Sequence, residues 1–173
     1  LNKQSKILWH VSNLYKIKNQ EKFAEQLCKK TFADKVFFTN SGAEAIECGL
    51  KVVKSYWNIK NKNKKNIITF EGAFHGRTFA ALSAQKNKKY SEGFTPLLKG
   101  FKKIPFNDEI SLNKNINKDT AAILIEPIQG EGGIKPASLK FLKYIKNVCK
   151  KHNILLFLDE VQSGFGRSGK LYS

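Results

Sequence analysis

Hydrophobic residues recur along this chain at two spacings, one typical of helices and the other typical of buried strands. Residues 43–59 place apolar side chains three and four positions apart, which predicts a long helix with one buried face. Short continuous apolar runs, such as residues 120–126, instead predict strands buried on both faces of a parallel sheet. The same reasoning predicts helices at residues 21–31, 43–59, 78–85 and 136–152, and strands at residues 35–39, 66–70, 101–106, 120–126 and 154–159.

The predicted helices and strands alternate, which is the pattern of an α/β fold. A helix between two strands favours parallel pairing, because the chain must cross over before it starts the next strand in the same direction. We therefore predict an α/β three-layer sandwich with a mainly parallel sheet. Residues 86–100 look irregular and residues 130–135 look like a loop. No repeat, linker or domain boundary stands out, so a single domain is expected.

The last predicted strand ends in a carboxylate. The apolar run at residues 155–158 is followed directly by Asp159, and Gln162 comes three positions later. A charge at the end of a strand buried on both faces is costly without a partner. Ligands of open α/β sheets bind outside the carboxyl ends of the strands. We therefore expect a cationic group beside Asp159 at this edge of the sheet.

A second candidate site lies at residues 39–45, where a predicted strand leads into the long helix. Ser41 is a good helix cap and Gly42 permits close approach to the backbone. The free amides of the first helical turn form a site for an anion, best suited to a phosphate. An ordinary, well-capped helix start is the alternative, and the segment alone does not decide between them.

The loop at residues 71–78 carries an aromatic ring, an imidazole and an arginine between glycines. Phe74 can stack on a planar ligand, and Arg77 can bind a carboxylate through two hydrogen bonds. A turn with a surface arginine is the alternative. A lone histidine is more often structural than catalytic, so the role of His75 stays open.

Two further carboxylates follow the strand predicted at residues 120–126. Glu126 and Glu131 are five positions apart and surrounded by glycines, so a general acid and base pair is one interpretation. We favour another, in which this loop orients ligands and Glu131 pairs with a basic group.

The formal net charge of +17 comes almost entirely from lysine. Arginine occurs only at positions 77 and 167. Nucleic-acid recognition favours the planar, bidentate group of arginine, so the composition argues against a nucleic-acid partner. A non-enzymatic module that binds polyanions remains an alternative, supported by charge alone.

Cysteine usage favours a reducing compartment. Cys28, Cys48 and Cys149 are odd in number, widely spaced and all within predicted helices, which fits buried thiols better than disulfides or a metal site. No apolar run is long enough to cross a bilayer, and the first residues lack the apolar region of a secretory signal. We expect a cytoplasmic protein without a membrane partner. The chain contains no methionine, even at position 1, so we expect a fragment.

A phosphate-binding turn, an aromatic ring, an arginine and an acid at the end of a strand are together what pyridoxal 5′-phosphate requires of a protein. Four motifs in this chain lie at residues 40–45, 74–78, 126–132 and 158–162. Through these motifs, in this order and over nearly its whole length, the chain resembles the class III (fold type I) aminotransferases. The resemblance implies pyridoxal 5′-phosphate as the cofactor.

The resemblance also implies a role for each motif. The implied cofactor-binding residues are Ser41, Gly42, Ala43, Phe74, Asp159, Glu160, Val161 and Gln162. Phe74 would stack on the pyridine ring, Asp159 would act catalytically by pairing with the ring nitrogen, and Gln162 would reach the ring hydroxyl. Arg77 would bind a substrate carboxylate, and Glu131 would also serve substrate binding. No metal is expected.

The resemblance further implies an incomplete large domain at residues 1–173. In this family the Schiff-base lysine lies well beyond the last motif, so Lys170 is not that lysine. The N-terminal segment and the C-terminal small domain are also missing by this comparison. We therefore expect the 173 residues alone to be inactive.

Within the family, the motifs most resemble homodimeric enzymes that transfer the terminal amino group of N-acetylornithine to 2-oxoglutarate in arginine biosynthesis. Members that use ornithine, succinylornithine, 4-aminobutyrate or diaminopelargonate remain alternatives. A glutamate semialdehyde aminomutase is disfavoured, because its relatives usually lack the motifs at residues 74–78 and glutamine at the position of Gln162.

Overall fold

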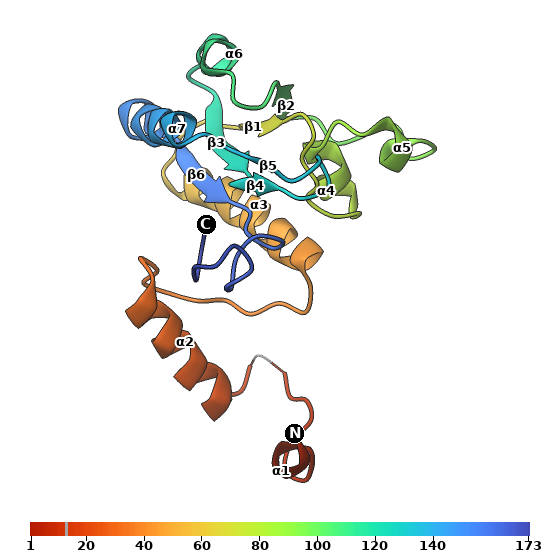
Figure 1. Ribbon diagram of the computed structural model, residues 1–173, viewed down its shortest axis with the longest axis vertical. Helices are drawn as coiled ribbons and strands as arrows, with labels where there is room; N and C mark the ends of the chain where they lie inside the picture. Colours follow the sequence, from red (N-terminus) through yellow and green to blue (C-terminus); the bar gives the residue numbers. More distant parts are fainter. Residues whose placement is uncertain (13) are drawn as a thin grey trace. The chain divides into compact units, whose positions relative to one another are not determined.

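The computed structural model describes residues 1–12 and 14–173, which form two compact units at residues 1–38 and 39–173. The first unit contains two helices, α1 (Asn2–Ser5) and α2 (Lys18–Lys30) (Figure 1). The second unit contains the strands of the described chain. The hydrophobic pattern does not reveal this division, because no glycine- or proline-rich linker marks it.

The strand predicted at residues 35–39 is wrong. This segment pairs with no other segment of the described chain. A strand requires a neighbour for its backbone hydrogen bonds, so an apolar run without one stays irregular. The side chain of Phe37 is correspondingly exposed, whereas Phe38 stacks on Phe23 with ring centroids 5.8 Å apart.

Four parallel strands form the sheet of the second unit, in the order β2-β1-β3-β6. Their bounds are β1 (Asn66–Phe70), β2 (Phe101–Ile104), β3 (Thr120–Ile125) and β6 (Leu155–Leu158). A separate antiparallel pair, β4 (Ile128–Gln129) and β5 (Lys135–Pro136), flanks the predicted loop. The parallel pairing confirms the predicted fold class, and the strand predicted at residues 66–70 is found with those bounds.

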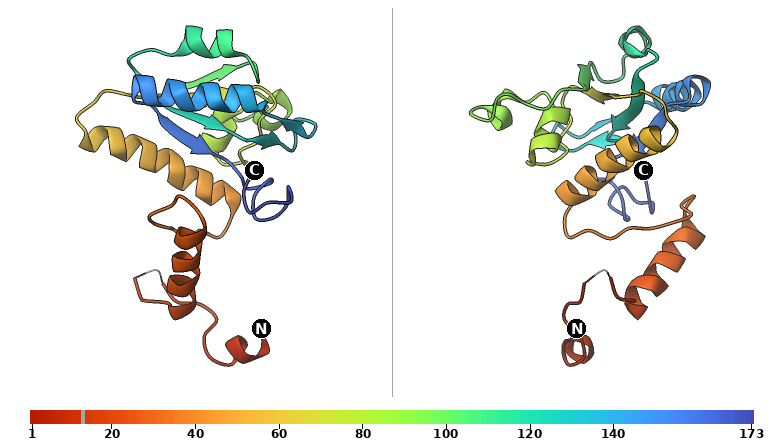
Figure 2. Two further views of the ribbon diagram at one scale, coloured as in Figure 1. Left: turned by 60° about the vertical axis from the view of Figure 1, so that its left-hand side comes forward. Right: turned by 180° about the vertical axis from the view of Figure 1, so that it is seen from behind.

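Helices cover both faces of the sheet, which confirms the three layers (Figure 2). On one face lie α3 (Gly42–Ile59) and α4 (Phe79–Ala84), and on the other lie α6 (Glu109–Asn115) and α7 (Leu139–His152). The short helices α5 (Lys88–Ser91) and α6 were not predicted, because neither is long enough to show a hydrophobic period. Among the described helices, none combines the length and apolar character needed to cross a membrane.

Serine side chains set where two of the helices begin. Ser41 accepts a hydrogen bond from the amide of Glu44 at 3.2 Å, so α3 starts one residue before the prediction. Ser138 accepts one from the amide of Phe141 at 3.1 Å. Because Pro136 pairs with Ile128 in the β4–β5 ribbon, α7 starts three residues after the prediction.

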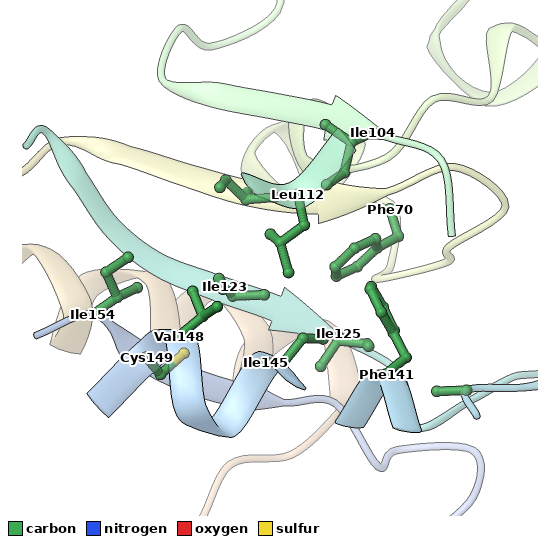
Figure 3. Packing of buried hydrophobic residues seen from close by; sticks show 12 residues of the cluster. Phe70, Ile104, Leu112, Ile123, Ile125, Phe141, Ile145, Val148, Cys149 and Ile154 are labelled. Atoms are coloured by element: carbon green, nitrogen blue, oxygen red, sulfur yellow. The ribbon is translucent and has the colours of Figure 1, made fainter. Parts of the chain in front are cut away.

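The hydrophobic core has two parts, one on each face of the sheet. On the α7 face, Phe141 of α7 packs against Phe70 of β1, in one buried cluster with Ile123 and Ile125 of β3 (Figure 3). On the α3 face, the indole Nε1 of Trp57 donates to the carbonyl of Ala121 at 2.9 Å. The buried tryptophan therefore anchors α3 to β3 through a satisfied polar group as well as through apolar area.

The α3 helix also lies close to β6, at Gly49. A Cβ atom at this position would overlap the ring of Phe157. Gly49 therefore permits a close helix–strand contact that any other residue would disrupt.

The strand β6 is not buried on both faces as predicted. It forms the edge of the described sheet, and Leu156 is 40% exposed. Three of the four side chains of β6 are at least half-buried. Its sequence is therefore as apolar as that of an inner strand, although it lies at the edge.

The three cysteines lie in helices, as predicted, and all are free thiols. Only Cys149 is fully buried, whereas Cys28 and Cys48 are half-buried, so the prediction of buried thiols holds for one of them. Burial raises the pKa of the Cys149 thiol to about 12, so it stays protonated at neutral pH.

Candidate active site

Asp159 lies directly after β6, and its carboxylate is buried. Its Oδ2 is 2.7 Å from Nδ1 of His75, and its Oδ1 accepts a hydrogen bond from the amide of Val161 at 3.1 Å. The Nε2 atom of His75 is buried and has no hydrogen-bond partner within the described residues. Within the described residues, the side chain that contacts the Asp159 carboxylate is therefore an imidazole.

A small cavity of about 60 Å³ adjoins this pair. Three segments that are far apart in the sequence line it: the start of α3, the loop after β1 and the segment after β6. The lining residues are Gly42, Ala43, Phe74, His75, Gly76, Asp159, Val161 and Gln162. Parallel strands bring their carboxyl ends to one edge of a sheet, which explains why the loop after β1 and the segment after β6 meet there.

Gly42 and Ala43, at the start of α3, both line this cavity. Ser41 caps the amide of Glu44, and within residues 1–12 and 14–173 the amides of Gly42 and Ala43 donate no hydrogen bond. Such free amides bind anions. A Cβ atom at position 42 would lie 2.6 Å from Cγ1 of Val161, so only glycine lets the two segments pack this closely.

Phe74 and Arg77 share an aromatic neighbour that the sequence did not indicate. The ring of Tyr90 meets Phe74 edge-on at a centroid distance of 5.7 Å, and the guanidinium of Arg77 lies 4.5 Å from the Tyr90 ring centroid. Stacking orients a guanidinium without using its hydrogen-bond donors. Arg77 is exposed and therefore still able to bind a carboxylate.

Four predicted site residues lie outside the cavity lining, namely Ser41, Arg77, Glu131 and Glu160. The Ser41 hydroxyl caps α3, and Oε2 of Glu160 accepts a hydrogen bond from the amide of Ser173 at 2.7 Å. Glu131 is exposed in the loop between β4 and β5. The structure therefore gathers Gly42, Ala43, Phe74, Asp159, Val161 and Gln162 around the cavity but does not bring the other four to it.

Glu126 supports the site, whereas sequence reasoning considered it only as a possible acid and base partner of Glu131. It is 3% exposed, and its Oε2 accepts a hydrogen bond from the amide of Phe74 at 2.9 Å. Burial raises the pKa of Glu126 to about 7, against the opposing effect of hydrogen bonds from the amides of Phe74 and Gly130. The charge of His75 also opposes the rise and that of Asp159 adds to it.

Gln85 was likewise not predicted. It follows α4, is 3% exposed, and its Oε1 accepts a hydrogen bond from the amide of His75 at 2.9 Å. Its Nε2 donates to the carbonyl of Gly76 at 3.3 Å. The sequence signal for Glu126 was a carboxylate directly after an apolar strand, as at Asp159, whereas an amide after a short alanine-rich helix has no comparable signal.

We predict that Glu126→Gln reduces the dependence of stability on pH. Because the folded protein holds the Glu126 proton more tightly than the ordinary pKa of 4.5 implies, this group stabilises the fold below pH 4.5. That contribution, about 3 kcal/mol at most, is lost as the pH rises through 7.

Urea unfolding between pH 5 and pH 8.5 measures this effect. The unaltered protein should lose more unfolding free energy over this interval than Glu126→Gln does, since glutamine does not ionise. Equal losses would mean that Glu126 is already ionised at pH 5.

A larger open hollow of about 720 Å³ lies at the start of β1. Its lining residues are Lys54, Ser55, Asn58, Lys62, Asn63, Lys64, Lys65, Asn66, Lys99 and Gly100. No acidic or aromatic side chain is among them, and Nζ of Lys64 already bonds to the carbonyls of His152 and Asn153. The hollow therefore lacks the mixture of groups found beside Asp159, despite its greater volume.

Comparison with known proteins places this site in a family. The sequence profile of the family described as aminotransferase class III matches residues 1–173. The chain belongs to the class III aminotransferases. This assignment agrees with the order and spacing of the four motifs, each of which contributes at least one residue to the cavity or to its support.

Relatives of this class III chain include two acetylornithine aminotransferases. The one from Agrobacterium fabrum is 53% identical, with 98% of this chain and 43% of the relative covered. The one from Brucella melitensis is 51% identical, with 100% and 43% covered. The chain thus spans less than half the length of these curated relatives.

Solved structures of similar proteins agree. The N-acetylornithine aminotransferase from Stenotrophomonas maltophilia has a TM-score of 0.83 and 39% identity, with 99% of this chain and 42% of that chain covered. The ornithine aminotransferase from Toxoplasma gondii has a TM-score of 0.93 and 28% identity over the same shares. The sheet and its covering helices are therefore those of the corresponding part of these enzymes.

Proposed function

We propose that the protein containing this chain transfers the terminal amino group of N-acetylornithine to 2-oxoglutarate, with pyridoxal 5′-phosphate as cofactor, in arginine biosynthesis. The observation that carries the proposal is the buried Asp159–His75 pair beside the free amides of Gly42 and Ala43. The names of relatives at 51% and 53% identity support the choice of amino donor.

The residues around the cavity fit this cofactor in three respects. The amides of Gly42 and Ala43 suit its phosphate, the Asp159 carboxylate suits a protonated ring nitrogen, and Phe74 offers an aromatic face. Val161, whose side chain is exposed, also lines the cavity. When bound, the cofactor supplies an electron sink for the carbon that carries the amino group.

His75 and Val161 hold the Asp159 carboxylate in one orientation. Nδ1 of His75 donates to Oδ2 and the amide of Val161 donates to Oδ1. A carboxylate fixed on both oxygens meets a developing cation without reorganisation, which is where buried electrostatic groups contribute most. In this proposal Asp159 keeps a proton on the ring nitrogen, and His75 is a positioning residue.

Substrate recognition is proposed for the exposed groups around the cavity. Arg77 would bind a substrate carboxylate, and Glu131 would pair with a basic group. Gln162 would bind the ring hydroxyl of the cofactor, with Ser41 and Glu160 supporting the two segments that flank it. We further propose that residues 1–173 form part of the large domain of a cytoplasmic homodimer, and that the Schiff-base lysine lies outside these residues.

We predict that the protein at the length of its relatives transaminates N-acetylornithine with a higher kcat/KM than ornithine, succinylornithine, 4-aminobutyrate or diaminopelargonate. Formation of glutamate from 2-oxoglutarate, measured for each donor, tests this. The 173 residues alone should show no turnover, because they contain no Schiff-base lysine in this proposal. A higher kcat/KM for another donor would replace the proposed substrate, and turnover by the 173 residues would contradict the proposed place of the lysine.

A further inference from the structure

In the loop between β1 and α4, side chains hold the backbone at Phe74, His75 and Gly76. Its backbone groups bond to side chains from other elements rather than to neighbouring strands. The amide of Phe74 donates to Glu126, the amide of His75 donates to Gln85, and the carbonyl of Gly76 accepts from Gln85. These three consecutive residues therefore depend on two side chains for their backbone hydrogen bonds.

The two supporting side chains approach this loop from different elements and are deeply buried. Glu126 follows β3 and Gln85 follows α4, and each is 3% exposed. A buried polar group that loses its partner is costly, so each side chain and the backbone group it binds stabilise one another. Neither side chain lines the cavity, which is formed instead by the residues they support.

We propose that Glu126 and Gln85 are positioning residues that fix the backbone of Phe74 and His75, so that the Phe74 ring and the His75 imidazole stay beside Asp159. The loop support follows from the hydrogen bonds themselves. Its consequence for binding a planar, phosphorylated pyridine rests on the proposed function. The two parts are separable by experiment.

Loss of either side chain should increase the population of other loop conformations. A ligand that requires the present conformation then binds more weakly, in proportion to the fraction of protein that still adopts it. We expect Glu126→Ala to lower the affinity for pyridoxamine 5′-phosphate about 10-fold, because the hydrogen bond from the Phe74 amide is lost. Gln85→Ala should have an effect of similar size, through His75 and Gly76.

Amide hydrogen exchange in the cofactor-free protein tests the support directly. Glu126→Ala should accelerate exchange of the Phe74 amide about 10-fold, and Gln85→Ala should do the same for His75. Each rate is taken relative to that of Ile123 in β3, which reports global opening. Glu126→Gln retains an acceptor oxygen and should keep the Phe74 amide protected.

Cys149→Ala provides the matched control, because it truncates a buried side chain on α7 that the loop does not contact. It should lower global stability without a selective effect on Phe74 or His75. Relative exchange rates in Glu126→Ala and Gln85→Ala that match those of the control would overturn the proposal.

A double-mutant cycle with Phe74→Ala separates positioning from general destabilisation. If Glu126 acts through Phe74, Glu126→Ala should change the affinity for pyridoxamine 5′-phosphate less than about 2-fold once the ring is gone. An undiminished effect would show that Glu126 acts by another route. If the unaltered protein does not bind pyridoxamine 5′-phosphate, the proposed function fails, whereas unchanged exchange rates overturn the positioning roles even where binding is intact.

Discussion

Asp159→Ala should lower kcat of the full-length enzyme by a factor of about 10³ and abolish the absorbance band of bound pyridoxal 5′-phosphate. The reason is electrostatic. Asp159 is the buried carboxylate at the cavity, and its two oxygens are already oriented by His75 and Val161. Without it, no buried anion among the cavity-lining residues would keep the ring nitrogen protonated. Spectrophotometric titration and steady-state kinetics measure the two effects.

Asp159→Asn distinguishes charge from shape. Asparagine keeps the volume and an oxygen that can accept from Nδ1 of His75, but it has no negative charge. We therefore expect nearly the same loss of kcat as for alanine, with a smaller change in unfolding free energy. If Asp159→Asn retains most of the activity, the carboxylate is not the partner of a protonated ring.

Phe141→Ala should lower the free energy of unfolding by about 3 to 5 kcal/mol. Phe141 is 1% exposed, and its ring packs edge-on against Phe70 and Phe106 at centroid distances of 5.6 and 6.3 Å. Removing it leaves a cavity between α7 and the sheet that stiff neighbours cannot fill (Figure 3). Urea unfolding at fixed pH measures the change.

Leu139→Ala on the same helix is the matched control. Leu139 is 76% exposed, so its truncation should change stability by less than about 0.5 kcal/mol. Comparable losses at positions 139 and 141 would mean that α7 does not pack on the sheet as described.

The sheet could be predicted from the sequence because its inner strands are apolar runs with helices between them. β1 and β3 are buried along nearly their whole length, and such runs have few alternative conformations in an α/β fold. The segment at residues 35–39 also contains an apolar run but pairs with no other described segment, and strand partners are not visible in a local pattern. The exposure of Leu156 was missed for a related reason, since the edge of a sheet depends on which strands pair.

The cavity residues could be predicted where a residue of suitable chemistry follows an apolar run or begins a helix. Asp159 ends an apolar run and Gly42 starts a capped helix, so each has a local signature. The support of the loop could not be predicted, because Glu126 and Gln85 act on backbone groups that are distant in the sequence. The same applies to Tyr90, whose ring joins Phe74 and Arg77 only after the chain has folded.

Gly49 does not line the cavity, but it controls a distance within the site. The α3 helix lies close to β6 at Gly49, two turns from the amides of Gly42 and Ala43, and Asp159 directly follows β6. The distance between the first turn of α3 and the Asp159 carboxylate therefore depends on the close contact of Gly49 with the ring of Phe157. A methyl group there would push helix and strand apart, and the two ends of a bound cofactor would no longer be reached together.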